Sequence, residues 1–267
     1  MATTQDELQT ERHGAAVTLW LNRPDRLNAF SEGMALALVQ ALARAGADPS
    51  VRVVIVRGRG RAFSAGGDVK QMAQDAAGGR PAAYFDRPLA AIHRAALAVR
   101  NLEKPVIAGL QGAVAGAGLN LALCCDYRVA ADDVRLIQAF TNIGLVPDTG
   151  GTYLLPRLVG RARATELLFE GRTVEAKEAR ELGLVNDVAP LAELDAAVER
   201  TAQRLAARPT RALGLTKRLL NAGATRTFEA QLAAERQLQQ ALGADSADAI
   251  EGVRAVVARR VPRFEGR

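Results

Sequence analysis

The stretch QGAVAGAGLNLALCCD, residues 111–126, decides the expected fold because it joins a strand to a helix through glycines. It follows the apolar run KPVIAGL (104–110), and Gly112, Gly116 and Gly118 precede a segment apolar enough for a buried helix. A strand, a glycine-rich loop and a helix together present free backbone N–H groups to a negative charge. Close packing of a strand on a helix also favours small residues, so packing is the favoured explanation for this stretch alone.

Two phosphate-binding patterns are excluded by the residues that follow these glycines. A dinucleotide site of the G-x-G-x-x-G type needs a third glycine, but Gly116-Ala117-Gly118 is followed by Leu119-Asn120-Leu121. The sequence contains neither GKS nor GKT, which excludes a P-loop. The negative charge that this loop would meet is therefore not defined by the loop itself.

A second glycine loop favours a binding role over close packing alone. The stretch AFSAGGDV (62–69) also follows an apolar strand, and Gly66-Gly67 leaves a backbone amide approachable. Two such loops can aim two N–H donors at one oxygen. A thioester carbonyl that becomes an enolate is an oxygen of this kind, and each donor contributes about 10²–10³ in rate. The two loops together therefore favour an acyl-thioester site.

Strands separated by helices are typical of α/β architecture with a parallel sheet. The predicted strands are residues 15–24, 51–58, 105–110, 126–130 and 134–137. The predicted helices are residues 31–49, with Ser31 as N-cap, residues 81–104, and a helix around 117–124.

The pattern changes from about residue 160 onward. The sequence becomes rich in Ala, Leu, Glu and Arg at helical spacing, and only LVNDVA (184–189) has the pattern of a strand. We place a boundary near residue 205, which divides the chain into a core of residues 1–205 and a helical region of residues 206–267. The second region is expected to be an interaction surface, and a set of helices packed on the same core is an equally good alternative.

Composition excludes several classes of protein. The chain has 267 residues, of which 49% are apolar and 4% aromatic. Its two cysteines, Cys124 and Cys125, are adjacent, which suits neither a disulfide nor a metal site. They are expected to fill apolar space. His13 and His93 are the only histidines, so a histidine metal centre is poorly supported. The net charge of +6 is scattered, which argues against nucleic-acid binding. Neither a secretory signal nor a membrane-spanning run is visible, and a cytoplasmic protein is expected.

Four segments together resemble the enoyl-CoA hydratase/isomerase, or crotonase, family. They are LNRPDRLNAF (21–30), RAFSAGGDV (61–69), KPVIAGLQGAVAGAGLNLALCCDYRVA (104–130) and IGLVPDTGGTYLLPRLVGRARA (143–164). The resemblance implies a spiral of repeated strand–strand–helix units in residues 1–205. It also implies that residues 206–267 form an oligomerisation region, in a homotrimer or a dimer of trimers. By position, it places the oxyanion-hole amides at Gly67 and Ala117, and the charge they meet is the enolate of the substrate thioester.

The resemblance also shows where this chain departs from the hydratases. Hydratases of the family use two glutamates to hold and split a water, and the corresponding positions here are Asn120 and Phe140. Neither residue can act as a base, so efficient addition of water is not expected, and both positions are counted among the substrate contacts. The remaining acid–base candidate is Asp148 in GLVPDTGGT. An aspartate after a proline is more often a helix cap, but family isomerases carry a catalytic carboxylate at this position.

Further residues are assigned by position in the family. Arg26, Leu27 and Ala29 are expected to contact the CoA nucleotide and pantetheine. Ala65, Asp68 and Val69 are expected to flank the first oxyanion amide, with a helix cap as the alternative for Asp68. Lys217 and Arg218 are expected on a solvated helix face, and contact with a CoA phosphate is the alternative.

The expected function is that of an acyl-CoA isomerase without a metal or a redox cofactor, in which CoA enters as part of the substrate. The segments 146–164 and 251–267 are similar to a branch that isomerises a ring epoxide in phenylacetate degradation, and an unsaturated fatty acyl-CoA is the other substrate considered. The alternatives are an enoyl-CoA hydratase that activates water in another way, and a non-catalytic acyl-CoA-binding or scaffold protein.

Overall fold

The computed structural model describes residues 7–267 and contains two β-sheets. Residues 1–6, the start of the N-terminal segment in which no secretory signal is visible, lie outside the described residues. The larger sheet has the strand order β1-β2-β3-β4-β6-β9, and only the β1–β2 pair is antiparallel. Its strands are β1 (Leu8–His13), β2 (Ala16–Leu21), β3 (Val53–Gly58), β4 (Val106–Leu110), β6 (Tyr127–Ala131) and β9 (Asp187–Ala189). The smaller sheet contains β5 (Ala113–Ala115), β7 (Arg135–Ile137) and β8 (Thr173–Glu175), in that order.

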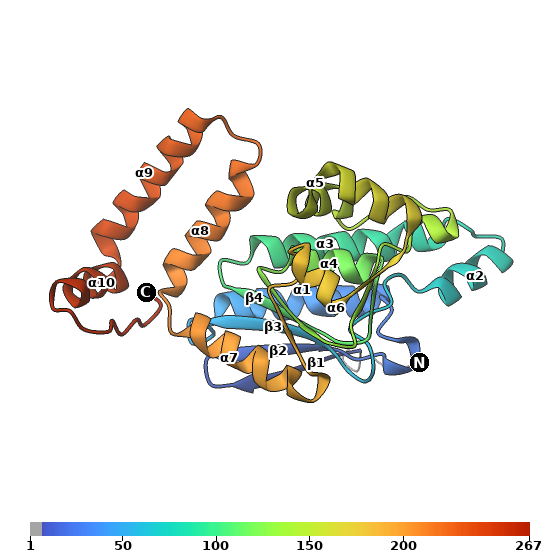
Figure 1. Cartoon of the computed structure of the whole chain (residues 1–267), viewed down its shortest axis with the longest axis horizontal. Coiled ribbons are helices and arrows are strands. Elements are labelled where there is room, and N and C mark those ends of the chain that lie inside the picture. The colour runs from blue at the N-terminus through green and yellow to red at the C-terminus, as the bar shows by residue number, and fades with distance from the viewer. Residues whose placement is uncertain (1–6) are drawn as a thin grey trace.

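Helices follow most of the strands and form a separate group at the C-terminal end (Figure 1). The α-helices are α1 (Glu32–Ala47), α2 (Val69–Ala77), α3 (Arg87–Asn101), α4 (Ala117–Cys124), α5 (Gly151–Glu170), α6 (Ala176–Glu181), α7 (Leu194–Ala206), α8 (Thr210–Gly223), α9 (Phe228–Asp245) and α10 (Ala247–Val257). Short 3-10 helices lie at η1 (Pro24–Arg26), η2 (Ala83–Phe85), η3 (Thr141–Ile143) and η4 (Leu191–Glu193).

One path of the chain recurs three times, as a strand of the larger sheet, a short stretch in the smaller sheet, and a turn that leads into a helix. β3 is followed by Ser64, which forms a parallel bridge with Val114 of β5, and then by α2. β4 is followed by β5 and α4, and β6 is followed by β7, a longer connection and α5. Because Ser64, β5 and β7 are neighbours, the chain leaves the smaller sheet at three adjacent points. The repeated strand–strand–helix path confirms the expected fold class.

Apolar side chains cover both faces of the larger sheet. On one face α1, α3 and α4 pack against alternate residues of the strands, with Leu19, Val54 and Ala108 among the buried positions. The helix α7 lies on the other face (Figure 1). Its buried Leu194 and Val198 belong to one apolar cluster with the intervening residues of the strands. A parallel sheet covered on both faces needs nearly continuous apolar strands, which explains the uninterrupted apolar runs in the sequence.

The predicted strands and helices are confirmed, with one break and several additions. Ser31 caps α1 by accepting a hydrogen bond from the Met34 amide. The predicted helix 81–104 is divided into η2 and α3, because Pro88 lies in the first turn of α3, where a proline favours the start of a helix. The strands β1, β5 and β8 were not predicted, since β1 is mostly polar and the other two are very short. The helix α2 was not predicted either.

The last three α-helices extend away from the sheets (Figure 1). α7 still packs on the larger sheet and ends at Ala206, whereas α8, α9 and α10 follow it without a strand. Large apolar side chains on these helices are exposed, including Leu220, Phe228 and Val257. The division near residue 205 and the role of residues 206–267 in oligomerisation remain proposals. Within residues 7–267, no helix combines the length and apolar character needed to cross a membrane.

We predict that Gly118→Ala destabilises the fold, whereas Gly243→Ala stabilises it. A methyl group on Gly118 of α4 would lie 2.7 Å from Ser64 Cβ and 2.8 Å from Ser64 O, and overpacking of this kind costs about 1–3 kcal/mol. A methyl group on Gly243 of α9 meets no atom within 4 Å, so alanine there is expected to add up to about 1 kcal/mol through helix propensity. Urea unfolding of both variants measures the two effects, and equal shifts of the same sign would contradict the close α4–Ser64 contact.

Candidate active site

The three turns that leave the smaller sheet meet at one cavity. Gly67 lies in the turn before α2, Ala117 is the first residue of α4, and Asp148 lies in the turn before α5. All three line the cavity, and Asp148 is the only one of the lining residues that has a carboxyl group. The remaining lining residues are mostly apolar: Ala65, Val69, Met72, Tyr84, Phe85, Ile92, Gly116, Ala139, Phe140, Ile143 and Leu145.

The backbone of the first turn is pressed against the second. Gly66 has a φ of +88°, and a methyl group added to it would lie 2.5 Å from Ala115 O and 3.1 Å from Ala117 N. Only glycine allows this close approach. The neighbouring segment holds the turn from the other side, since the Phe30 amide donates to Gly66 O at 2.7 Å and the Ala65 amide donates to Leu27 O at 2.8 Å.

The amides of Gly67 and Ala117 are both available to a ligand. From residue 7 onward, neither amide donates a hydrogen bond to another protein group. The Ala117 amide is free because it belongs to the first turn of α4, where N–H groups have no partner within the helix. Two free donors on the wall of one cavity can bind an oxygen that carries negative charge, which is the requirement for stabilising an enolate.

Asp148 presents a carboxyl group to the same cavity. The Thr149 hydroxyl donates to Asp148 Oδ1 at 2.7 Å. Burial raises the pKa of the Asp148 carboxyl above its ordinary value, while the Thr149 hydroxyl and the nearby His93 act in the opposite direction. The alternative role as a helix cap is not seen, because α5 begins after Gly150 without a side-chain cap.

A second hollow begins on the other side of Asp148. It lies between α3 and α5 and is mainly apolar, with His93, Ala96, Leu97 and Arg100 on one wall and Tyr153 and Leu154 on the other. Asp148 lines both spaces, so this residue lies between the cavity that holds the free amides and a second space that extends along α3.

The two positions at which hydratases carry glutamates have different surroundings. Phe140 lines the cavity and lies against Gly116, where a methyl group would be 3.6 Å from the phenyl ring. Asn120 is fully buried, does not line the cavity, and uses its amide within the protein. Its Nδ2 donates to Asp148 O at 2.8 Å, and its Oδ1 accepts from Gln138 Nε2 at 2.8 Å. The expectation that Asn120 contacts the substrate is therefore corrected.

The residues assigned around the first turn separate into two groups. Ala65 and Val69 line the cavity together with Gly67. Asp68 does not: it caps α2 by accepting from the Gln71 amide at 3.1 Å, and it pairs with Arg23 at 3.0 Å. The cap given as the alternative for Asp68 is thus the arrangement observed.

The segment Arg26–Ala29 lies beside the first turn and outside the cavity wall. Arg26 is close to Asp68, with 3.9 Å between Nη1 and Oδ1, and its side chain is 40% exposed. Leu27 holds the first turn through its carbonyl, and Ala29 is buried. Contact of Arg26, Leu27 and Ala29 with CoA remains a prediction.

Two residues near the site were not predicted. The buried Tyr84 hydroxyl accepts from the Asp68 amide at 3.0 Å and donates to Phe30 O at 2.8 Å, and burial raises its pKa to about 12. His93 Nε2 accepts from the Thr149 amide at 3.3 Å. No motif marks either residue. The only sequence signal is that the chain has just three tyrosines and two histidines.

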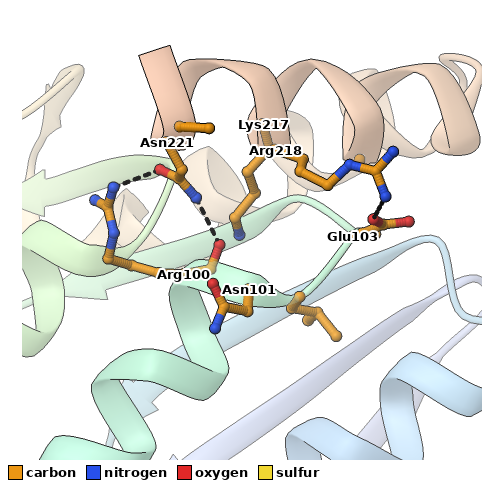
Figure 2. A pocket seen from close by; sticks show the side chains of 9 residues that line it. Arg100, Asn101, Glu103, Lys217, Arg218 and Asn221 are labelled. Atoms are coloured by element: carbon orange, nitrogen blue, oxygen red, sulfur yellow. Dashed lines mark hydrogen bonds and ion pairs between the residues drawn. The ribbon is translucent and has the colours of Figure 1, made fainter. Parts of the chain in front are cut away.

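Lys217 and Arg218 differ in burial although they are adjacent in α8 (Figure 2). Lys217 is 9% exposed, and its Nζ donates to Val99 O and to Asp126 Oδ2, both at 2.8 Å. The expectation of a solvated face is wrong for Lys217, because this side chain fixes α8 to the end of α3. The expectation of a solvated face is confirmed for Arg218, which is exposed and pairs with Glu103. Cys124 and Cys125 are free and buried, as expected.

Comparison with known proteins agrees with the fold and the cavity. The profile of the family "Enoyl-CoA hydratase/isomerase" matches residues 11–267. The chain is 40% identical over 256 residues to 1,2-epoxyphenylacetyl-CoA isomerase from Escherichia coli, which covers 94% of this chain and 95% of that one. It is 38% identical to a Rhodobacter capsulatus protein named "Probable enoyl-CoA hydratase", with 95% of both chains covered.

The solved structures give the same result. The structure of an enoyl-CoA hydratase from Polaromonas sp. JS666 superposes with a TM-score of 0.90 at 34% identity, over 96% of this chain and 99% of that one. The fold is thus the crotonase-like spiral of a family of hydratases and isomerases. The chain belongs to the enoyl-CoA hydratase/isomerase family.

We predict different losses of stability when Lys217 and Arg218 are each replaced by methionine. Lys217→Met leaves Asp126 without its cation and is expected to lower the free energy of unfolding by about 2–3 kcal/mol, less than for a fully buried pair because the Asp126 side chain is 25% exposed. Arg218→Met removes an exposed pair and is expected to change it by about 0–1 kcal/mol. Urea unfolding of both variants provides the measurement. Equal losses would show that Lys217 is not a structural anchor.

We also predict that Asp148→Asn stabilises the fold at neutral pH. A carboxyl whose pKa is raised by folding contributes stability that is present below its unfolded pKa and is lost as pH rises through its folded pKa. The uncharged asparagine avoids this loss. Its advantage over the wild type should therefore be present at pH 8 and disappear towards pH 3.8, the ordinary pKa of the carboxyl. Thermal unfolding across this range measures the difference, and a less stable variant at pH 8 would contradict a net penalty from burial.

Proposed function

We propose that the protein is an acyl-CoA isomerase that moves a double bond through an enolate, with Asp148 as the acid and base. The observation that carries the proposal is the composition of the cavity. It combines two free amides, Gly67 and Ala117, with one carboxyl group and otherwise mainly apolar side chains. One carboxylate beside an oxygen-binding pair is sufficient to take a proton from one carbon and return it to another.

The mechanism follows for a 3-enoyl thioester. Asp148 removes a proton from the carbon next to the thioester, and the electron pair moves onto the carbonyl oxygen, where the amides of Gly67 and Ala117 stabilise the charge. The dienolate then takes the proton back from Asp148 at the fourth carbon. The double bond now lies between the second and third carbons, and no atom has been gained or lost.

The surroundings of Asp148 support this role. Burial raises the pKa of the carboxyl, which makes the carboxylate a stronger base and keeps the proton available for its return. The apolar lining of the cavity, including Phe140 and Leu145, excludes water from the dienolate.

Hydration is the second candidate, because a relative named as a probable hydratase is 38% identical, close to the 40% of the named isomerase. Addition of water by the pair of groups expected in hydratases is disfavoured here. Phe140 has no proton-transfer group, and the Asn120 amide is used within the protein. A third possibility, a binding protein without turnover, is disfavoured by the presence of both free amides and the carboxyl.

The nature of the acyl group is part of the proposal. The name of the Escherichia coli relative suggests the ring epoxide of phenylacetyl-CoA, and an unsaturated fatty acyl-CoA is the alternative. In either case we propose that CoA enters as part of the substrate, that no metal or redox cofactor takes part, and that the chain acts in the cytoplasm. We further propose a homotrimer or a dimer of trimers formed through α8–α10, which the exposed apolar side chains on these helices support.

The test is a product assay with trans-3-enoyl-CoA and trans-2-enoyl-CoA as parallel substrates. We predict conversion of the 3-enoyl to the 2-enoyl thioester without a gain in mass. Asp148→Asn should reduce this rate by about 10²–10⁴, the usual contribution of a positioned acid–base group. Asp187→Asn, which removes an exposed carboxyl on β9, serves as the control and should keep the wild-type rate.

Other outcomes would point to the other candidates. Formation of a 3-hydroxyacyl-CoA as the main product would establish a hydratase. Wild-type turnover by Asp148→Asn would remove Asp148 from the mechanism. Tight binding of acyl-CoA without turnover of either substrate, or of the ring epoxide, would favour a binding protein.

A further inference from the structure

The turn that carries Asp148 has an unfavourable backbone. The Gly151 amide donates to Asp148 O at 3.0 Å, which closes a four-residue turn. Both central residues are in the left-handed region, with φ of +51° at Thr149 and +82° at Gly150. Glycine adopts this region freely, but a β-branched residue such as threonine rarely does. A turn of this kind persists only where its surroundings hold it.

Two side chains from different helices hold the backbone of this turn. Asn120 of α4 donates from Nδ2 to Asp148 O at 2.8 Å. His93 of α3 accepts from the Thr149 amide through Nε2 at 3.3 Å. Both contacts fall on the peptide group that links Asp148 to Thr149. They fix the plane of this peptide group, which is bonded directly to the Cα that carries the Asp148 side chain, and so restrict the direction of that side chain.

The orientation of the Asn120 amide is fixed by its partners. A backbone carbonyl can only accept, so the NH₂ group of Asn120 must face Asp148 O. Its Oδ1 then faces Gln138, whose Nε2 donates to it at 2.8 Å. Since Asn120 is fully buried, the amide has no solvent-facing alternative. A carboxylate at residue 120 would have no proton to give to the Asp148 carbonyl.

The start of α5 is built around this amide. A methyl group on Gly151 would lie 2.3 Å from Asn120 Nδ2 and 2.6 Å from Oδ1. Only glycine at this position lets the first turn of α5 rest against the amide. Asn120 thus connects two helix starts: it lies one turn after Ala117 in α4, and it contacts the residue with which α5 begins.

We infer that Asn120 is a positioning residue that sets the location of the Asp148 carboxyl relative to the Ala117 amide. The same short helix carries the oxygen-binding donor and the anchor of the base, so one side chain fixes the separation between them. The inference rests on the proposed isomerase function in so far as its effect is measured as a rate. Asn120 does not contact the substrate and acts through Asp148.

The test compares Asn120→Ala in two backgrounds. In the wild type, the variant should lower kcat by about 10²-fold, the effect of a misplacement of about 1 Å, with a much smaller change in KM. In the Asp148→Ala background, it should leave the residual rate unchanged, because no carboxyl remains to be positioned. Asn120→Asp, which keeps the size and the acceptor but loses the donor, should lower kcat in the same way.

The matched control is Asn221→Ala. Asn221 makes the same kind of contact, since its Nδ2 donates to Arg100 O at 2.8 Å and its Oδ1 accepts from the Arg100 guanidinium (Figure 2). It lies in α8 and lines neither space next to Asp148, so its loss should leave kcat unchanged. If Asn120→Ala lowers the residual rate of Asp148→Ala by the same factor as the wild-type rate, Asn120 acts independently of Asp148 and the inference is overturned.

A second measurement does not depend on activity. The pKa of Asp148, followed by NMR of ¹³C-labelled aspartate, should move towards its ordinary value in Asn120→Ala and stay in place in Asn221→Ala. An unchanged pKa in Asn120→Ala would overturn the inference even if the wild type isomerises 3-enoyl thioesters. If the pKa of Asp148 changes in Asn120→Ala but the wild type isomerises no substrate, the proposed function is refuted and the positioning role is supported.

Discussion

The pairing of Ser64 with Val114 is the contact on which the site depends. The Ser64 amide donates to Ala113 O at 3.3 Å, and the Ala115 amide donates to Ser64 O at 2.9 Å, so that a single residue of the first connection joins the smaller sheet. β7 pairs with β5 on the other side, and three consecutive turns therefore emerge next to one another. Because side chains alternate in a strand, a slip of one residue would turn Val114 out of the core, which fixes the register. The relative positions of Gly67, Ala117 and Asp148 follow from this register.

The fold was largely predictable, because its main features are local patterns. The apolar runs of β3 and β4 and the helical periodicity of α1 identify the α/β architecture, and the glycines at 66 and 116 mark the turns. β1 could not be predicted in the same way, since its stability comes from pairing with β2 and its residues are polar and exposed. The path of the smaller sheet escaped prediction as well, because strands of three residues carry no periodicity.

The site was predictable only in part. Resemblance to the family pointed to Gly67, Ala117 and Asp148, which line one cavity, but the environment of each is a tertiary property. No sequence pattern shows that Asn120 faces away from the cavity, or that Lys217 is buried, because both depend on contacts with segments distant in the chain. The left-handed Thr149 is contrary to its residue preference and is imposed by its neighbours.

The two free amides have a consequence for how such a protein can change during evolution. In the proposed mechanism both donors to the thioester oxygen belong to the main chain, whereas the proton carrier is a side chain on a separate turn. Replacement of a side chain, other than by proline, therefore leaves the donors in place, provided that the glycines keep the turns closed. Activation of a thioester and the subsequent fate of the enolate are encoded in different parts of the molecule. A lineage can exchange one carboxyl, or the wall around it, and obtain a new reaction from an unchanged activating apparatus.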